Sequence, residues 1–169
     1  PDSNRGLGLS WHQDTGRVNR EMETSPRPRL SVKVAYFLSD TSEENRGNFH
    51  IIPGSQLKDT MKWPKGNRNQ MVKGAIPVLA PKGSAVIFDR RLWHSASANY
   101  WQPRKVIFYG YAYRWLQARG DCNVKNVWDQ LSPIRKQMCR YSPSGIHGYT
   151  SPKEEDVPLK SWIRKYQGF

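Results

Sequence analysis

The chain has 169 residues, which is enough for one domain with a hydrophobic core. Its hydrophobic residues, 37% of the total, include no apolar run long enough to span a bilayer, and we recognise no signal-peptide pattern. Lysine and arginine number 27 against 14 acidic residues, and the net charge of +13 predicts affinity for anions. Because Cys122 and Cys139 form no zinc or redox motif, we expect free thiols and a cytoplasmic chain.

A histidine and a carboxylate lie two residues apart near the start of the chain. Residues 9–14 are predicted to form a short strand, in which His12 and Asp14 would point to the same face. His94, on a later predicted strand, would add a second imidazole. Two histidines and one carboxylate on one face are typical of non-haem Fe(II) oxygenases. The alternative is an ordinary strand histidine that is bonded to a nearby aspartate.

Short strands separated by glycine and proline turns fill most of the chain. The clearest covers residues 30–38, where Leu, Val, Val, Tyr and Leu recur with period two. In chain order, strands are predicted over residues 9–14, 30–39, 47–52, 75–80, 85–89, 92–98 and 105–115. This pattern favours an all-β barrel or sandwich.

The composition changes near Gly120, where helical patterns replace the strands. Helices are predicted over residues 56–61, 133–140 and 157–167, the first capped by Ser55 and the second by Ser132. We therefore expect a β core over residues 1–120 and a small helical extension over 121–169, packed on that core. Residues 15–29 are long and irregular, which is typical of a lid or a substrate loop.

Four segments of the sequence occur in a fixed order. They are Trp11-His12-Gln13-Asp14; Gly47-Asn48-Phe49-His50-Ile51-Ile52-Pro53-Gly54-Ser55-Gln56; Gly83 through Phe88-Asp89 to Leu92-Trp93-His94; and Arg104, ten residues past His94. As an ordered set they resemble the landmarks of the phytanoyl-CoA dioxygenase family of Fe(II)- and 2-oxoglutarate-dependent oxygenases. The resemblance covers roughly residues 9 to 115.

The resemblance implies an all-β core of the double-stranded β-helix type, a jelly-roll or cupin-like barrel. It also implies that His12, Asp14 and His94 form the catalytic centre and bind Fe(II), with 2-oxoglutarate and O2 as co-substrates. Arg104 would bind the far carboxylate of 2-oxoglutarate, because a guanidinium matches a carboxylate with two parallel hydrogen bonds. Arg90 and Arg91 are alternatives for this role. Both precede the distal histidine, and we expect their side chains to face solvent.

Two departures from the family pattern affect the expected cofactor pocket and fold. The position two residues after the distal histidine is often polar in the family, but here it is Ala96. Ser95 and Ser97 are both candidates to replace it, and we assign the second cofactor contact to Ser97. Only eleven residues precede His12, so we expect the first core strand of the family fold to be missing.

The expected reaction is hydroxylation of an unactivated C–H bond. Related halogenases replace the metal-binding carboxylate with a small residue, whereas this chain retains Asp14. The net charge favours a small acidic substrate, and Gln13, Arg17 and Tyr36 are candidates to contact it. His50 and His147 are expected to be structural.

Three other functions remain open from the sequence. A nucleic-acid oxygenase of the AlkB type would fit the charge, but Asn99 and Arg104 do not reproduce its cluster of Arg and Asn residues after the distal histidine. The second alternative is a truncated or inactive β-barrel binding protein, and the third is a metal cupin that works without 2-oxoglutarate. We expect no membrane partner, and the sequence leaves the oligomeric state open.

Overall fold

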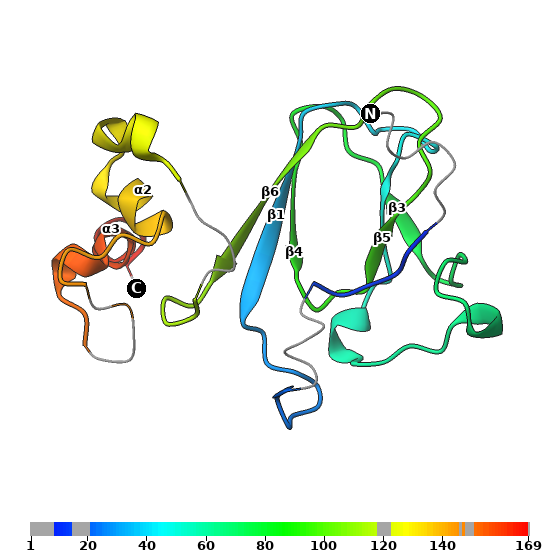
Figure 1. Ribbon diagram of the computed structural model, residues 1–169, viewed down its shortest axis with the longest axis horizontal. Coiled ribbons are helices and arrows are strands. Elements are labelled where there is room, and N and C mark those ends of the chain that lie inside the picture. Colours follow the sequence, from blue (N-terminus) through cyan, green and yellow to red (C-terminus); the bar gives the residue numbers. More distant parts are fainter. Residues whose placement is uncertain (1–8, 15–20, 118–122, 146, 148–150, 169) are drawn as a thin grey trace. The chain divides into compact units, whose positions relative to one another are not determined.

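The computed structural model describes residues 9–14, 21–117, 123–145, 147 and 151–168 (Figure 1). The chain divides into two compact units, Pro1–Ala112 and Tyr113–Phe169. The first unit contains the strands and the second contains helices, so the protein is mostly β with C-terminal helices. Among the described residues, no helix is long and apolar enough to cross a membrane.

Two antiparallel sheets of three strands each form the first unit. In one sheet, β1 (Ser31–Phe37) lies between β4 (Ala85–Asp89) and β6 (Val106–Ala112), as Figure 1 shows. In the other, β2 (Phe49–Ile51) lies between β3 (Ile76–Val78) and β5 (His94–Ala96). The prediction of strands at these six places is confirmed, although most are shorter than predicted.

The hydrophobic core lies between the two sheets, because its side chains come from strands of both. Phe37 on β1, Phe49 on β2 and Phe88 on β4 belong to one buried cluster. The rings of Phe49 and Phe88 meet with their centroids 4.8 Å apart. Aromatic contact between the sheets therefore holds them face to face.

The inward face of β1 is the one that carries Ala35 and Phe37, which are 0% and 1% exposed. Tyr36 and Leu38 belong to the other face and are 38% and 46% exposed. Both faces of this strand carry apolar residues, so the period of two identified the strand without deciding which face turns inward.

The predicted strand over residues 9–14 is reduced to a single bridge. His12 and His94 pair antiparallel, and each backbone N–H donates to the carbonyl of the other at 3.0 Å. Trp11 is fully buried, and its indole Nε1 donates to the Gln70 carbonyl at 2.9 Å. Among the described residues the pairing with β5 is limited to this bridge. The burial of Trp11 and the backbone hydrogen bonds of Trp11 to Arg68 and of Asp14 to Arg90 hold the rest of the segment.

The predicted helix over residues 56–61 is wrong beyond its first turn. Only a 3-10 helix, η1, forms over Ser55–Leu57, and Lys58 is already extended. The Ser55 hydroxyl does not cap this turn, since it accepts a hydrogen bond from the backbone N–H of Trp93 at 3.0 Å. The Lys58 carbonyl accepts from Gln13 and from the Trp93 indole, at 3.1 and 2.9 Å. Tertiary hydrogen bonds thus replace those of a longer helix.

The second unit contains two short 3-10 helices and the two predicted α-helices. In the described residues these elements are η3 (Lys125–Gln130), α2 (Pro133–Met138), η4 (Glu154–Asp156) and α3 (Pro158–Gln167). A further 3-10 turn, η2 (Pro64–Gly66), belongs to the first unit. Ser132 caps α2 as predicted, accepting from the backbone N–H of Arg135 at 3.4 Å. The division of the chain at residue 120, and packing of the extension on the core, stay predictions.

The two faces of β1 should differ sharply in their contribution to stability. Phe37→Ala should lower the free energy of unfolding by about 3–5 kcal/mol, because it leaves a cavity between the sheets. Leu38→Ala, next to it on the exposed face, should cost about 1 kcal/mol or less. Urea denaturation of the two variants measures both values, and equal losses would contradict this assignment of the faces.

Candidate metal centre

Three side chains from distant parts of the sequence converge in the first unit. One ligand atom from each of His12, Asp14 and His94 lies within 4.8 Å of the others. The backbone bridge between the two histidines produces this approach, and their ring centroids are 4.4 Å apart. Asp14 joins them because its own N–H donates to the Arg90 carbonyl at 3.2 Å.

Each histidine ring is oriented by a backbone carbonyl. The Nδ1 of His12 donates to the Ser10 carbonyl, and the Nδ1 of His94 donates to the Leu92 carbonyl, both at 2.8 Å. A carbonyl oxygen can only accept, so the proton of each neutral ring is on Nδ1 and the lone pair is on Nε2. This is the arrangement in which a histidine presents Nε2 to a metal.

His94 is buried against aromatic side chains, and His12 is exposed. The His94 ring lies 5.3 Å from the ring of Phe49 and 5.4 Å from that of Phe88, measured between centroids. Burial lowers the pKa of His94 from 6.5 to about 4, so the ring is neutral at physiological pH. The candidate centre therefore has an apolar wall behind His94 and an open side at His12.

Asp14 is an ionised carboxylate whose two oxygens face different partners. Its Oδ1 lies 3.8 Å from the Nε2 of His94, while its Oδ2 accepts from the Nζ of Lys33 at 2.9 Å. The Nε of Arg90 is 3.9 Å from the same Oδ2. Burial by itself would raise the pKa of Asp14, but the hydrogen bond from Lys33 and the nearby positive charges outweigh it, so the pKa lies below its ordinary value.

Sequence reasoning did not select Lys33, and it expected Arg90 to face solvent. A signal for Lys33 was present, since it is the only charged residue within the period-two pattern of residues 30–38. Its importance depends on the contact with Asp14, which lies in a segment that the sequence does not connect with β1.

Arg104 is partly exposed and lies near the start of β2. Its Nη1 donates to the Gly47 carbonyl at 2.6 Å, and burial lowers the pKa of its guanidinium. A Cβ atom on Gly47, whose φ is +68°, would lie 3.2 Å from Asn99 and 3.6 Å from Arg104, so glycine allows this close approach. Within the described part of the chain, Arg104 has no carboxylate partner.

Ser97 presents a buried hydroxyl that has no hydrogen-bond partner among the described residues. Its backbone N–H donates to the Asn48 carbonyl at 2.9 Å, which fixes the residue just past the end of β5. The neighbouring Ser95 is already engaged, since its hydroxyl accepts from the Ser10 N–H at 2.7 Å. Of these two serines, Ser97 is thus the one whose hydroxyl has no partner among the described residues.

Two residues predicted to contact a substrate are not brought to the three converging side chains. Gln13 is buried, donates to the Lys58 and Arg91 carbonyls, and accepts from Arg27 at 2.5 Å, as expected for the residue between His12 and Asp14 on an extended segment. Tyr36 lies on the outward face of β1, in edge-to-face contact with Tyr109 at 5.9 Å. Whether either residue contacts a substrate stays a prediction.

Three further basic residues were considered in the sequence, and the structure describes two of them. Arg17 lies outside the described residues. Arg91, one alternative for binding 2-oxoglutarate, is paired with Asp89 at 2.7 Å. His50 is buried and its Nδ1 donates to the Asn48 carbonyl at 3.1 Å, which agrees with a structural role.

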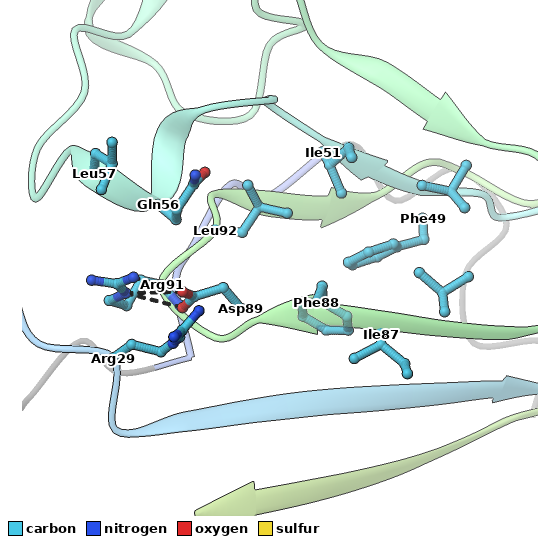
Figure 2. Close-up of a pocket in the computed structure, with 12 residues that line it drawn as sticks. Arg29, Phe49, Ile51, Gln56, Leu57, Ile87, Phe88, Asp89, Arg91 and Leu92 are labelled. Carbon is cyan, nitrogen blue, oxygen red and sulfur yellow. Dashed lines mark hydrogen bonds and ion pairs between the residues drawn. The ribbon is translucent and has the colours of Figure 1, made fainter. Parts of the chain in front are cut away.

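A cavity of about 520 Å³ lies behind the aromatic wall of the centre. Phe49 and Phe88 line it and also contact His94, but none of the three converging side chains lines it. Figure 2 shows its apolar side chains and, at the other end, the Arg91–Asp89 ion pair. The full lining is Arg29, Phe49, Ile51, Gln56, Leu57, Val78, Val86, Ile87, Phe88, Asp89, Arg91 and Leu92.

Comparison with known proteins shows which family the chain belongs to. The sequence profile of the phytanoyl-CoA dioxygenase (PhyH) family matches residues 2–102. The chain therefore belongs to this family of iron- and 2-oxoglutarate-dependent oxygenases. It is also 33% identical to the dioxygenase andF of Emericella variicolor over 124 residues, which are 71% of this chain and 41% of that protein. The chain thus spans less than half the length of this relative.

Several solved structures are similar in part. EvdMO1 covers 66% of this chain and 24% of its own, with 22% identity and a TM-score of 0.48. AviO1 from Streptomyces viridochromogenes covers 64% and 46%, with 26% identity and a TM-score of 0.45. HygX from Streptomyces hygroscopicus, solved with nickel, 2-oxoglutarate and hygromycin B bound, covers 64% and 49%, with 16% identity and a TM-score of 0.45.

The burial of neutral His94 predicts an acid-sensitive stability in the metal-free protein. Its folded pKa of about 4 lies below the ordinary 6.5, so protons bind the unfolded chain first and stability falls as the pH drops through this window. Between pH 7 and pH 5 the loss from this residue should be about 2 kcal/mol.

Urea denaturation of the chelator-treated protein at both pH values measures this loss. His94→Gln should remove it, whereas the same change at the exposed His147 should leave it in place. A His94→Gln variant with the wild-type dependence on pH would refute the assignment.

Proposed function

We propose that this chain forms the iron- and 2-oxoglutarate-binding core of an oxygenase that hydroxylates an unactivated C–H bond of a small anionic organic molecule. The observation that carries the proposal is the convergence of His12, Asp14 and His94, with their ligand atoms within 4.8 Å. The two facing sheets, with His12 bridged to β5, support a core of the double-stranded β-helix type.

The chemistry of the three side chains fits iron. Two imidazoles whose Nδ1 atoms bond to backbone carbonyls, and one ionised carboxylate, supply three ligands on one face and leave other positions open. When bound there, iron with 2-oxoglutarate and O2 supplies the oxidising power for C–H hydroxylation. Retention of Asp14 supports hydroxylation over halogenation.

Arg104 and Ser97 are the residues that we assign to 2-oxoglutarate. The partly buried guanidinium of Arg104 donates to the Gly47 carbonyl and has no carboxylate partner among the described residues, so it can take the far carboxylate of the co-substrate. The buried hydroxyl of Ser97 can donate to a second oxygen.

The remaining groups orient the centre and limit water. Carbonyls of Ser10 and Leu92 fix the two imidazoles, and Lys33 holds one oxygen of Asp14 so that the other faces His94. Phe49 and Phe88 cover the side behind His94. Access for a substrate is then from the side of the exposed His12.

An anaerobic titration of Fe(II) in the presence of 2-oxoglutarate tests the proposal through the visible charge-transfer band of the chelate. The wild-type chain should develop the band. Asp14→Ala should abolish it, because one of three ligands is lost. Arg104→Ala should weaken 2-oxoglutarate binding by about 10- to 100-fold, the effect of one hydrogen-bonded charge pair.

Matched controls are available at exposed positions. Asp129→Ala and Arg68→Ala remove a carboxylate and a guanidinium outside the centre and should leave the band unchanged. A folded wild-type chain that gives no band would contradict the proposal and favour an inactive binding protein. Turnover that does not depend on 2-oxoglutarate would favour a metal cupin.

A further inference from the structure

We propose that Lys33 and Arg90 form an anion site beside the metal centre, and that it binds a carboxylate group of the primary substrate. The inference rests on the proposed function and names the substrate class, an organic acid. Both cations approach the same oxygen of Asp14, with the Lys33 Nζ at 2.9 Å and the Arg90 Nε at 3.9 Å.

Arg90 is the first part of the argument, because its buried Nε has no hydrogen-bond acceptor among the described residues. The 3.9 Å separation from Asp14 is an ion pair but is too long for a hydrogen bond. Buried polar groups in folded proteins are nearly always hydrogen-bonded. A guanidinium held in this way can therefore take an anion that has two oxygens.

The sheet leaves room for this arginine. Gly110 of β6 lies opposite Lys33 of β1 in the antiparallel register. A Cβ atom on Gly110 would lie 3.4 Å from the Nη1 of Arg90, so the arginine occupies the space that a side chain would fill. Arg90 directly follows β4, and Lys33 lies in β1, the strand between β4 and β6, so both are brought to the same part of the first unit.

Lys33 supplies the second charge. Its ammonium donates to Asp14 and lies 4.7 Å from the centre of the Phe108 ring. An ammonium has three N–H donors, and Asp14 is its one hydrogen-bond acceptor among the described residues. Two cations therefore face one carboxylate, and a metal ion at the centre would increase the excess of positive charge.

This site is distinct from the one that we assign to 2-oxoglutarate. Arg104 precedes β6, whereas Gly110, beside Arg90, lies in its second half, so about 20 Å of extended chain separates the two positions. The residues also have different neighbours, since Arg104 bonds to Gly47 and Lys33 to Asp14. Two separated cationic positions are suited to two different anions.

Calorimetric titrations with the anaerobic protein, loaded with Fe(II) and 2-oxoglutarate, test the inference. The probes are phenylacetate and octanoate, each compared with its uncharged amide. At least one acid should bind at least tenfold more tightly than its amide. Arg90→Met should remove this preference, Arg90→Lys should keep part of it, and Lys82→Met at an exposed turn should leave it intact.

Arg90→Met is the decisive variant, because Lys33 bonds directly to a proposed metal ligand. Lys33→Met should also lose the preference for the acid. If neither acid is preferred over its amide by the loaded wild-type protein, the inference is overturned. It is also overturned if Arg90→Met weakens 2-oxoglutarate and not the acid, since the site would then serve the co-substrate. Failure of the wild-type protein to form the charge-transfer band would instead overturn the proposed function.

Discussion

The reciprocal hydrogen bonds between the backbones of His12 and His94 are the constraint on which the site depends. They join an N-terminal segment to β5 across more than eighty residues of sequence, and they set the two imidazoles side by side. Asp14 follows His12 by two residues. Its side chain reaches the same point because side chains two residues apart on an extended chain lie on the same face. Trp11, fully buried, anchors the segment that carries these residues.

Electrostatics then determine the state of each group at the centre. Burial among aromatic rings keeps His94 neutral, while Lys33 and Arg90 keep Asp14 ionised despite its partial burial. A neutral imidazole and an ionised carboxylate are the forms that bind metal. Arg104 has no carboxylate partner in the described part of the chain, so the first unit has cationic groups in two separate places.

Local sequence patterns predicted some helices and strands correctly, and tertiary hydrogen bonds prevented another helix from forming. Strong alternation and turn residues identified β1 and β4, and a serine before Pro133 identified the start of α2. The helix expected after Ser55 failed because that hydroxyl and the Lys58 carbonyl are used by Trp93 and Gln13. Such long-range hydrogen bonds override a local cap signal and have no trace in the adjacent sequence.

The sequence by itself determined the order of the motifs, the places of most strands and the shared face of His12 and Asp14, because spacing along an extended chain fixes which residues share a face. His94 was added to them by the order of the family landmarks. Only the tertiary structure decided which face of β1 turns inward, that Lys33 and Arg90 reach Asp14, and that Tyr36 does not. The physical reason is that a period of two defines two faces but does not distinguish them. That choice depends on the side chains that other strands bring against each face.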